Sequence, residues 1–140
     1  MIFPKNWKHY ILLHHGNKRK LERFGNVITN RPEPAAMWNK SLTESDWKNA
    51  DAIFTEQKNQ KGFWNTELED WNLSYPFCNQ KIRFKLSQGT FKHLGVFPEQ
   101  ADNWEFIREK CSAFLVKGIT PKFLNLFAYT GGASLAADLC

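Results

Sequence analysis

The sequence lacks the patterns that mark several classes of protein. Its three cysteines, Cys78, Cys111 and Cys140, are odd in number and far apart, and no Cys-x-x-Cys pair exists, so neither a disulfide framework nor a zinc knuckle is indicated. No apolar run approaches the roughly eighteen residues of a membrane span, and the N-terminus has no hydrophobic signal core. We therefore expect a protein of the reducing cytoplasm that neither holds a metal nor enters a membrane.

Aromatic residues are the abundant exception in an otherwise ordinary composition. They make up 15% of the 140 residues, whereas the hydrophobic share of 42% and the charged share of 24% lie close to the globular average. The formal net charge is +5 and the pI is about 9.2, which permits nucleic-acid or phosphate binding without requiring it. The composition predicts a ring-rich core and exposed rings that are free to stack on a ligand.

Short strands and turns are expected in the first third of the chain. Residues 10–13 form an apolar run, residues 14–20 form a polar turn, and residues 27–29 resume a strand after a Gly-Asn dipeptide. The two prolines in residues 31–34 then interrupt regular structure, because each proline restricts the residue before it.

A helix and a further strand are expected in the middle of the chain. Thr43 and Asp46 have the spacing of a capping box, which predicts a short helix over residues 43–54. Residues 82–86 alternate apolar and charged side chains, a pattern typical of a half-buried strand. Residues 91–97 are candidates for its hairpin partner.

The clearest helix begins at Pro98 and ends at Gly118. Proline suits the first helical turn, and acidic side chains lie near the start, where they are favoured. Apolar residues recur at helical spacing, and we expect this stripe to lie in the core: Trp104, Ile107, Cys111, Phe114 and Leu115.

Residues 123–140 carry the pattern with the most chemistry. An apolar run over residues 123–129 is typical of a buried strand, two glycines follow at positions 131 and 132, and residues 133–137 begin a helix of small side chains. Glycines allow a tight turn and the close approach of a ligand, and the following helix start presents free N–H groups. The pattern predicts the opening βα unit of a nucleotide-type sheet, although two glycines alone are also found in plain loops.

Residues 123–132, Phe-Leu-Asn-Leu-Phe-Ala-Tyr-Thr-Gly-Gly, resemble the first motif of class I S-adenosylmethionine (SAM)-dependent methyltransferases related to the large-subunit ribosomal RNA cytosine methyltransferases. Residues 91–104 resemble the Lys-x-Gly-x-Phe-x-Asp-Gln-Arg-x-Asn-Arg stretch that precedes this motif in the family, and the single helix between the two also matches. Residues 20–25 and 31–38 resemble the N-terminal region of one bacterial branch. The resemblance therefore covers most of the chain.

The resemblance implies a role for each matched residue. The methionine end of SAM would be lined by the motif residues Phe127, Ala128, Tyr129, Thr130, Gly131 and Gly132. Gln100 matches the family glutamine and is a further candidate for the same pocket. Two family arginines are replaced by Ala101 and Trp104, so their part in RNA contact does not carry over.

The expected fold class is α/β, or α+β for the chain as it stands. A β-rich N-terminal module over residues 1–97, a candidate for RNA contact, precedes residues 98–140, the first helix and first βα unit of an incomplete Rossmann-like methyltransferase sheet. A second parallel strand needs a crossover of about a dozen residues or more, and the acid that binds the ribose normally lies about twenty residues past the glycines. Both fall beyond Cys140, so we expect negligible methyl transfer by these 140 residues alone.

Three basic or histidine-containing segments are weaker candidates. Lys92 and His93 are candidates for substrate or phosphate contact, with a half-exposed strand histidine as the alternative. The cluster of residues 18–20 with Arg23 is either a solvated turn or a surface for single-stranded RNA. His14 and its neighbour would point to opposite faces of a strand, which disfavours a shared metal ion.

The complete enzyme is expected to methylate RNA, and a non-catalytic module that binds nucleic acid or a partner protein is the alternative. A dinucleotide oxidoreductase is disfavoured, because Thr130-Gly-Gly-Ala-Ser-Leu does not supply Gly-x-Gly-x-x-Gly. The methylated base, the catalytic residues and the oligomeric state are left open.

Overall fold

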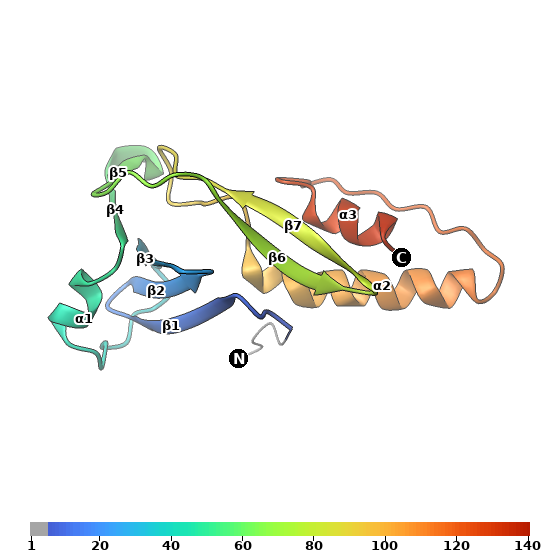
Figure 1. Ribbon diagram of the computed structural model, residues 1–140, viewed down its shortest axis with the longest axis horizontal. Helices are drawn as coiled ribbons and strands as arrows, with labels where there is room; N and C mark the ends of the chain where they lie inside the picture. Colours follow the sequence, from blue (N-terminus) through green and yellow to red (C-terminus); the bar gives the residue numbers. More distant parts are fainter. Residues whose placement is uncertain (1–5) are drawn as a thin grey trace. The chain divides into compact units, whose positions relative to one another are not determined.

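The computed structural model describes residues 6–140, which group into two compact units (Figure 1). Among the described residues, the first unit contains residues 6–8 together with Ser74–Phe84 and Val96–Cys140, and the second contains His9–Leu73 and Lys85–Gly95. The expected division of the chain at residue 97 stays a prediction.

A five-stranded sheet with the order β1-β2-β3-β4-β5 forms the second unit. Neighbouring strands are antiparallel except β3 and β4, which run parallel with Thr29 opposite Ala52. The strands expected at residues 10–13 and 27–29 are confirmed as parts of β1 and β3, and the sheet adds three more. The turn expected over residues 14–20 was wrong except at Asn17 and Lys18, because residues 14–16 pair with residues 19–21 as neighbouring strands. The strand bounds are β1 (Tyr10–Gly16), β2 (Arg19–Phe24), β3 (Val27–Pro32), β4 (Ala52–Glu56) and β5 (Gly62–Trp64).

Helix α1 (Glu44–Lys48) begins at the predicted capping box but is shorter than predicted. The Asp46 N–H donates to the Thr43 hydroxyl at 3.3 Å, and the Thr43 N–H donates to the Asp46 carboxylate at 2.9 Å. The extension of this helix to residue 54 was wrong, because residues 52–56 are strand β4. Phe54 is fully buried and its ring lies 5.2 Å from that of Trp64, so pairing and packing within the sheet override the helical spacing.

Strands β6 (Trp71–Phe77) and β7 (Gln80–Leu86) form a hairpin (Figure 1). Its residues 74–84 belong to the first unit, and the strand ends outside this range belong to the second. The predicted strand over residues 82–86 is confirmed as part of β7. The pairing with residues 91–97 was wrong: that segment is not a strand, and its backbone makes an isolated bridge from Phe91 to Lys61 and one hydrogen bond from the Ser87 N–H to the Leu94 carbonyl at 3.1 Å. Gly95, at φ +112°, turns the chain away from the extended conformation that a partner strand would need.

Helix α2 (Ala101–Leu115) is the longest element of the first unit, and the short 3₁₀ turn η2 (Pro98–Gln100) precedes it. A further 3₁₀ turn, η1 (Lys58–Gln60), lies in the second unit. The expected core stripe of α2 is confirmed at Trp104 and Cys111, which are buried. The prediction of a core position was wrong for Phe114 and Leu115, which are exposed by 47% and 45%. These two residues form the C-terminal end of α2.

Aromatic rings make the core of the first unit. Tyr75 on β6 and Phe84 on β7 contact Trp104 on α2, with ring centroids 5.2 and 5.3 Å apart, and Trp7 lies 4.9 Å from Tyr75. The Trp7 indole also donates to the Pro98 carbonyl at 3.0 Å. The ring-rich core expected from the composition is therefore present, and it fixes the start of α2 against the hairpin.

Helix α3 (Gly132–Asp138) follows the glycine turn, as predicted. Residues 123–129 before it are not a strand, because no strand among residues 6–140 pairs with them. Parallel strands of this kind are normally covered on both faces and paired on their edges, whereas Leu124, Leu126 and Phe127 are exposed by 75% or more. The mixed α/β fold with an incomplete Rossmann-like unit is confirmed. No helix among the described residues is long and apolar enough to cross a membrane.

Candidate functional site

A cavity of about 350 Å³ lies in the first unit where α3 begins. It brings together Gln100 and five of the six residues expected from the glycine motif; Gly131 is the exception and does not line it. Gly131 is instead the left-handed N-cap of α3, at φ +81°, and shapes the turn. The lining residues are Phe84, Val96, Phe97, Gln100, Trp104, Phe127, Ala128, Tyr129, Thr130, Gly132 and Ala133.

The wall of this pocket requires glycine at position 132. A Cβ atom placed there would lie 3.1 Å from the Trp104 ring and 3.3 Å from the Phe84 ring, which is tighter than ordinary packing. The two rings are themselves stacked at 22° and buried, so neither moves easily. Residue 132 therefore brings the backbone of α3 directly onto the aromatic wall.

Two further rings line the pocket. The centroids of Phe97 and Tyr129 lie 4.8 Å apart, and Tyr129 has a left-handed backbone with φ +48°. A non-glycine residue in this conformation costs on the order of 1 kcal/mol or more and is common where a ligand is held. Aromatic faces also attract cations at short range. The pair therefore suits a ligand that is planar or positively charged.

Polar groups in the pocket are few. The Gln100 side-chain oxygen accepts from the Asn103 amide at 2.8 Å, which leaves the Gln100 NH₂ group as a donor. Thr130 adds one hydroxyl. The lining contains no carboxylate, imidazole or thiol, so these residues can bind and orient a ligand but offer no strong general acid or base.

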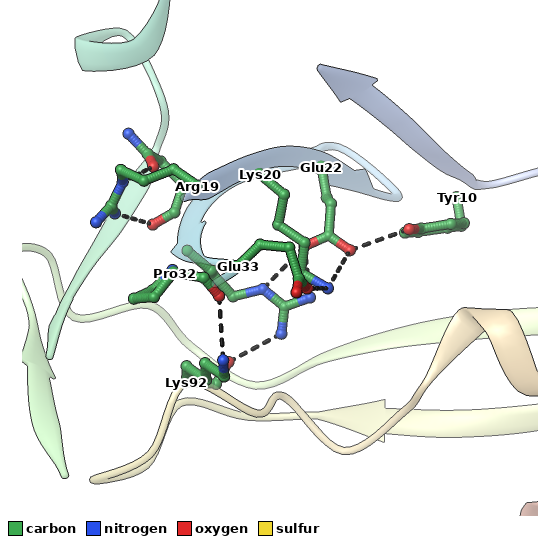
Figure 2. A network of polar contacts seen from close by, with 9 residues as sticks. Tyr10, Arg19, Lys20, Glu22, Pro32, Glu33 and Lys92 are labelled. Carbon is green, nitrogen blue, oxygen red and sulfur yellow. Dashed lines mark hydrogen bonds and ion pairs between the residues drawn. The ribbon is translucent and has the colours of Figure 1, made fainter. Parts of the chain in front are cut away.

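Lys92 and His93 lie in the second unit, whereas the pocket belongs to the first. The Lys92 ammonium donates to the Pro32 carbonyl at 3.2 Å, and the Lys92 carbonyl accepts from Arg31 at 2.8 Å, as Figure 2 shows. Lys92 thus has a structural role in joining two segments of this unit. Contact of either residue with a substrate stays a prediction.

Arg19 and Lys20 of the basic cluster form hydrogen bonds and ion pairs with other residues of the second unit (Figure 2). The Arg19 guanidinium donates to the Asn30 side chain and to the Phe54 carbonyl, and burial lowers the pKa of Arg19. The Lys20 ammonium lies 3.5 Å from Glu22 and 3.4 Å from a second carboxylate, that of Glu33. These two cations therefore stabilise the fold, and their charged groups are already bound to partners within the protein.

A buried ion pair that the sequence did not predict lies at the centre of this network. Glu22 is fully buried and accepts from two nitrogens of Arg31 at 2.6 and 3.0 Å. The Tyr10 hydroxyl donates to its other oxygen at 3.0 Å. The alternation of β2 gives no signal for this pair, because both residues are charged types that normally lie at the surface.

Histidines of β1 make local contacts. A ring nitrogen of His14 lies 2.6 Å from the Ser41 hydroxyl, and the Trp38 indole donates to His15 at 2.9 Å. Among residues 6–140 no three His, Cys, Asp or Glu side chains are grouped so that they could hold a metal ion.

No family model and no curated protein matches the chain. Solved structures do match, among them the crystal structure of the SAM-dependent methyltransferase from Agrobacterium tumefaciens, which covers 94% of this chain with 36% sequence identity and a TM-score of 0.75. The match covers 41% of that methyltransferase, so this chain spans less than half of its length. In both fold and sequence, the chain is therefore similar to part of a SAM-dependent methyltransferase.

Proposed function

We propose that the protein belongs to a methyltransferase that uses SAM to methylate RNA, and that the pocket beside α3 holds the cofactor. The observation that carries the proposal is the gathering of Gln100 and residues 127–130 and 132 around one cavity, since these residues were matched to the family from sequence alone. The similarity to the Agrobacterium tumefaciens enzyme supports the same cofactor.

The pocket suits SAM in size and chemistry. The volume of the pocket, about 350 Å³, falls in the range of about 300–1,000 Å³ that is typical of small-molecule sites, and such sites are mostly apolar with a few polar groups. Bound SAM would supply a methyl group on a positively charged sulfur. The rings of Phe97 and Tyr129 would attract that charge, and the Gln100 NH₂ group would donate to the carboxylate of the methionine end.

An RNA substrate is the finer part of the proposal. The net charge of +5 favours a polyanion, and the motif resembles that of ribosomal RNA methyltransferases. The pocket lining offers no strong base, so the residues that complete catalysis are expected outside it. The activity of the whole enzyme is therefore proposed together with its substrate.

Calorimetric titration with SAM tests the pocket. We expect one molecule of SAM to bind per chain. The variant Gln100→Ala should raise the dissociation constant for SAM roughly tenfold, because a hydrogen bond to a charged group contributes about 1.5–3 kcal/mol. Gln80→Ala is the matched control, because Gln80 is exposed at the start of β7 and does not line the pocket. Equal SAM affinity in Gln100→Ala and Gln80→Ala would show that Gln100 does not contact the cofactor. If the unchanged protein did not bind SAM, the proposal would be refuted.

A further inference from the structure

A second cavity in the first unit, of about 520 Å³, does not share any lining residue with the cofactor pocket. We call it the hairpin hollow, because the turn between β6 and β7 forms one side of it. The N-terminal segment and the polar face of α2 form the others. Its lining residues are Asn6, Lys8, Pro76, Cys78, Asn79, Glu105, Arg108 and Ser112.

The one carboxylate of the hollow is already satisfied. The first oxygen of Glu105 accepts from the Tyr75 hydroxyl at 2.9 Å and from the Asn6 amide at 3.3 Å. The second oxygen accepts from the Nε of Arg108 at 2.8 Å. Burial raises the pKa of Glu105, but these hydrogen bonds outweigh it and lower the pKa, so the group is ionised at neutral pH. Glu105 therefore balances one cation and does not attract another.

The remaining polar groups of the hollow can donate hydrogen bonds, although its amides and hydroxyl can also accept them. Lys8 is exposed, and its ammonium has no ion-pair partner among residues 6–140. Arg108 uses Nε for Glu105, which leaves the two terminal amino groups of its guanidinium. The side chains of Asn79 and Ser112 add an amide and a hydroxyl. With Glu105 balanced by Arg108, the charge of Lys8 remains, so the side chains that line the hollow carry a net positive charge and include several hydrogen-bond donors.

We propose that the hairpin hollow is a phosphate-binding subsite that holds the backbone of the RNA substrate. An ammonium, a planar guanidinium and neutral donors around one open cavity are the groups that recognise phosphate oxygens. The use of Arg19 and Lys20 within the second unit leaves RNA phosphates to be bound by other cations. The inference rests on the proposed function in taking RNA, and not another phosphate compound, as the ligand.

The test compares RNA binding by two single-site variants of the protein. Lys8→Gln removes the cation of the hollow that has no ion-pair partner among residues 6–140, and Lys81→Gln removes another exposed lysine, on β7, that does not line the hollow. Binding of a fluorescein-labelled single-stranded RNA of mixed sequence is followed by anisotropy at several salt concentrations. We expect Lys8→Gln to weaken binding several-fold and to reduce the slope of log K against log salt by about 0.7, as for one lost phosphate contact on a single strand.

A double variant, Lys8→Gln with Arg108→Gln, should reduce the same slope by about 1.4. The Lys81→Gln control should leave both affinity and slope close to those of the unchanged protein. Equal losses for Lys8→Gln and Lys81→Gln would overturn the subsite, because they would indicate diffuse attraction by the net charge. Binding of inorganic phosphate, followed by ³¹P NMR, that depends on Lys8 while RNA binding does not would overturn the assignment to RNA.

Failure of this inference and failure of the proposed function give different results. Normal RNA binding by Lys8→Gln would overturn only the subsite. No RNA binding by the unchanged protein would overturn the RNA substrate and the subsite together. SAM affinity, measured in the same preparations, should be the same in all variants because none of the changed residues lines the cofactor pocket. A loss of SAM affinity in Lys8→Gln would indicate a damaged fold and would count against the inference.

Discussion

At the scale of single residues, the degree of burial separates ion pairs that stabilise the fold from those that contribute little. Arg31 and Glu22 are almost completely buried and meet at 2.6 Å, whereas Lys85 and Asp70 meet at 2.8 Å with their side chains 71% and 45% exposed. Buried pairs are costly to break because one charge is left without a partner in a poorly polar environment, and exposed pairs contribute little.

We therefore predict that Arg31→Met destabilises the protein by about 3 kcal/mol or more. The exposed pair provides the control, and Asp70→Asn should cost about 1 kcal/mol or less. Urea unfolding followed by tryptophan fluorescence measures both changes. If the free energy of unfolding fell by the same amount in the two variants, Lys20 and Tyr10 would be sufficient partners for the Glu22 carboxylate. The Arg31–Glu22 pair would then not be the centre of the network.

At the scale of elements, α2 is tied to β6 through one carboxylate. Glu105 on α2 accepts from Tyr75 on β6 at 2.9 Å and from Arg108 one turn along the helix at 2.8 Å. Burial raises the pKa of Tyr75, and its hydrogen bond to Glu105 raises it further. The opposite shift of Glu105, whose pKa is lowered from its ordinary value of 4.5, makes the contact between these elements dependent on pH.

The lowered pKa of Glu105 fixes the direction of that dependence. The unfolded chain binds this proton more tightly than the folded chain, so the contribution to stability is complete above pH 4.5 and is lost as the pH falls through the folded pKa. We predict that Glu105→Gln flattens the fall in stability below pH 4.5. Glu109→Gln, an exposed change on the same helix, should leave the fall unchanged; parallel curves for all three proteins in urea titrations would contradict the role of Glu105.

Local sequence patterns predicted the elements whose partners lie nearby. The capping box of Thr43 and Asp46, the strand within β7 and the helix after Gly131 needed only short-range information. The failures involve distant partners: Phe54 pairs within a strand that lies between β3 and β5, and residues 91–97 bridge to Lys61 instead of forming a ladder with β7. The pocket residues were found through a motif, whereas the hairpin hollow joins side chains from positions 6 to 112, which no local pattern connects.

At the scale of the whole molecule, the segment before α3 exposes a row of apolar side chains. Leu124, Leu126 and Phe127 are exposed by 78%, 75% and 93%, on a segment that no described strand pairs. The Agrobacterium tumefaciens methyltransferase is matched over only 41% of its length. The pocket beside α3, which we propose holds the cofactor, lies within the first unit, so cofactor binding is the property of this chain that can be tested most directly.

The most direct measurement is photo-cross-linking of radiolabelled SAM to the protein, followed by tryptic digestion. Cleavage after Lys122 releases residues 123–140 as one peptide, which contains every motif residue of the pocket. We predict that the label is found chiefly in this peptide and that unlabelled SAM competes it away. Label that is absent, that resists competition, or that lies mainly in residues 9–73 would contradict the account.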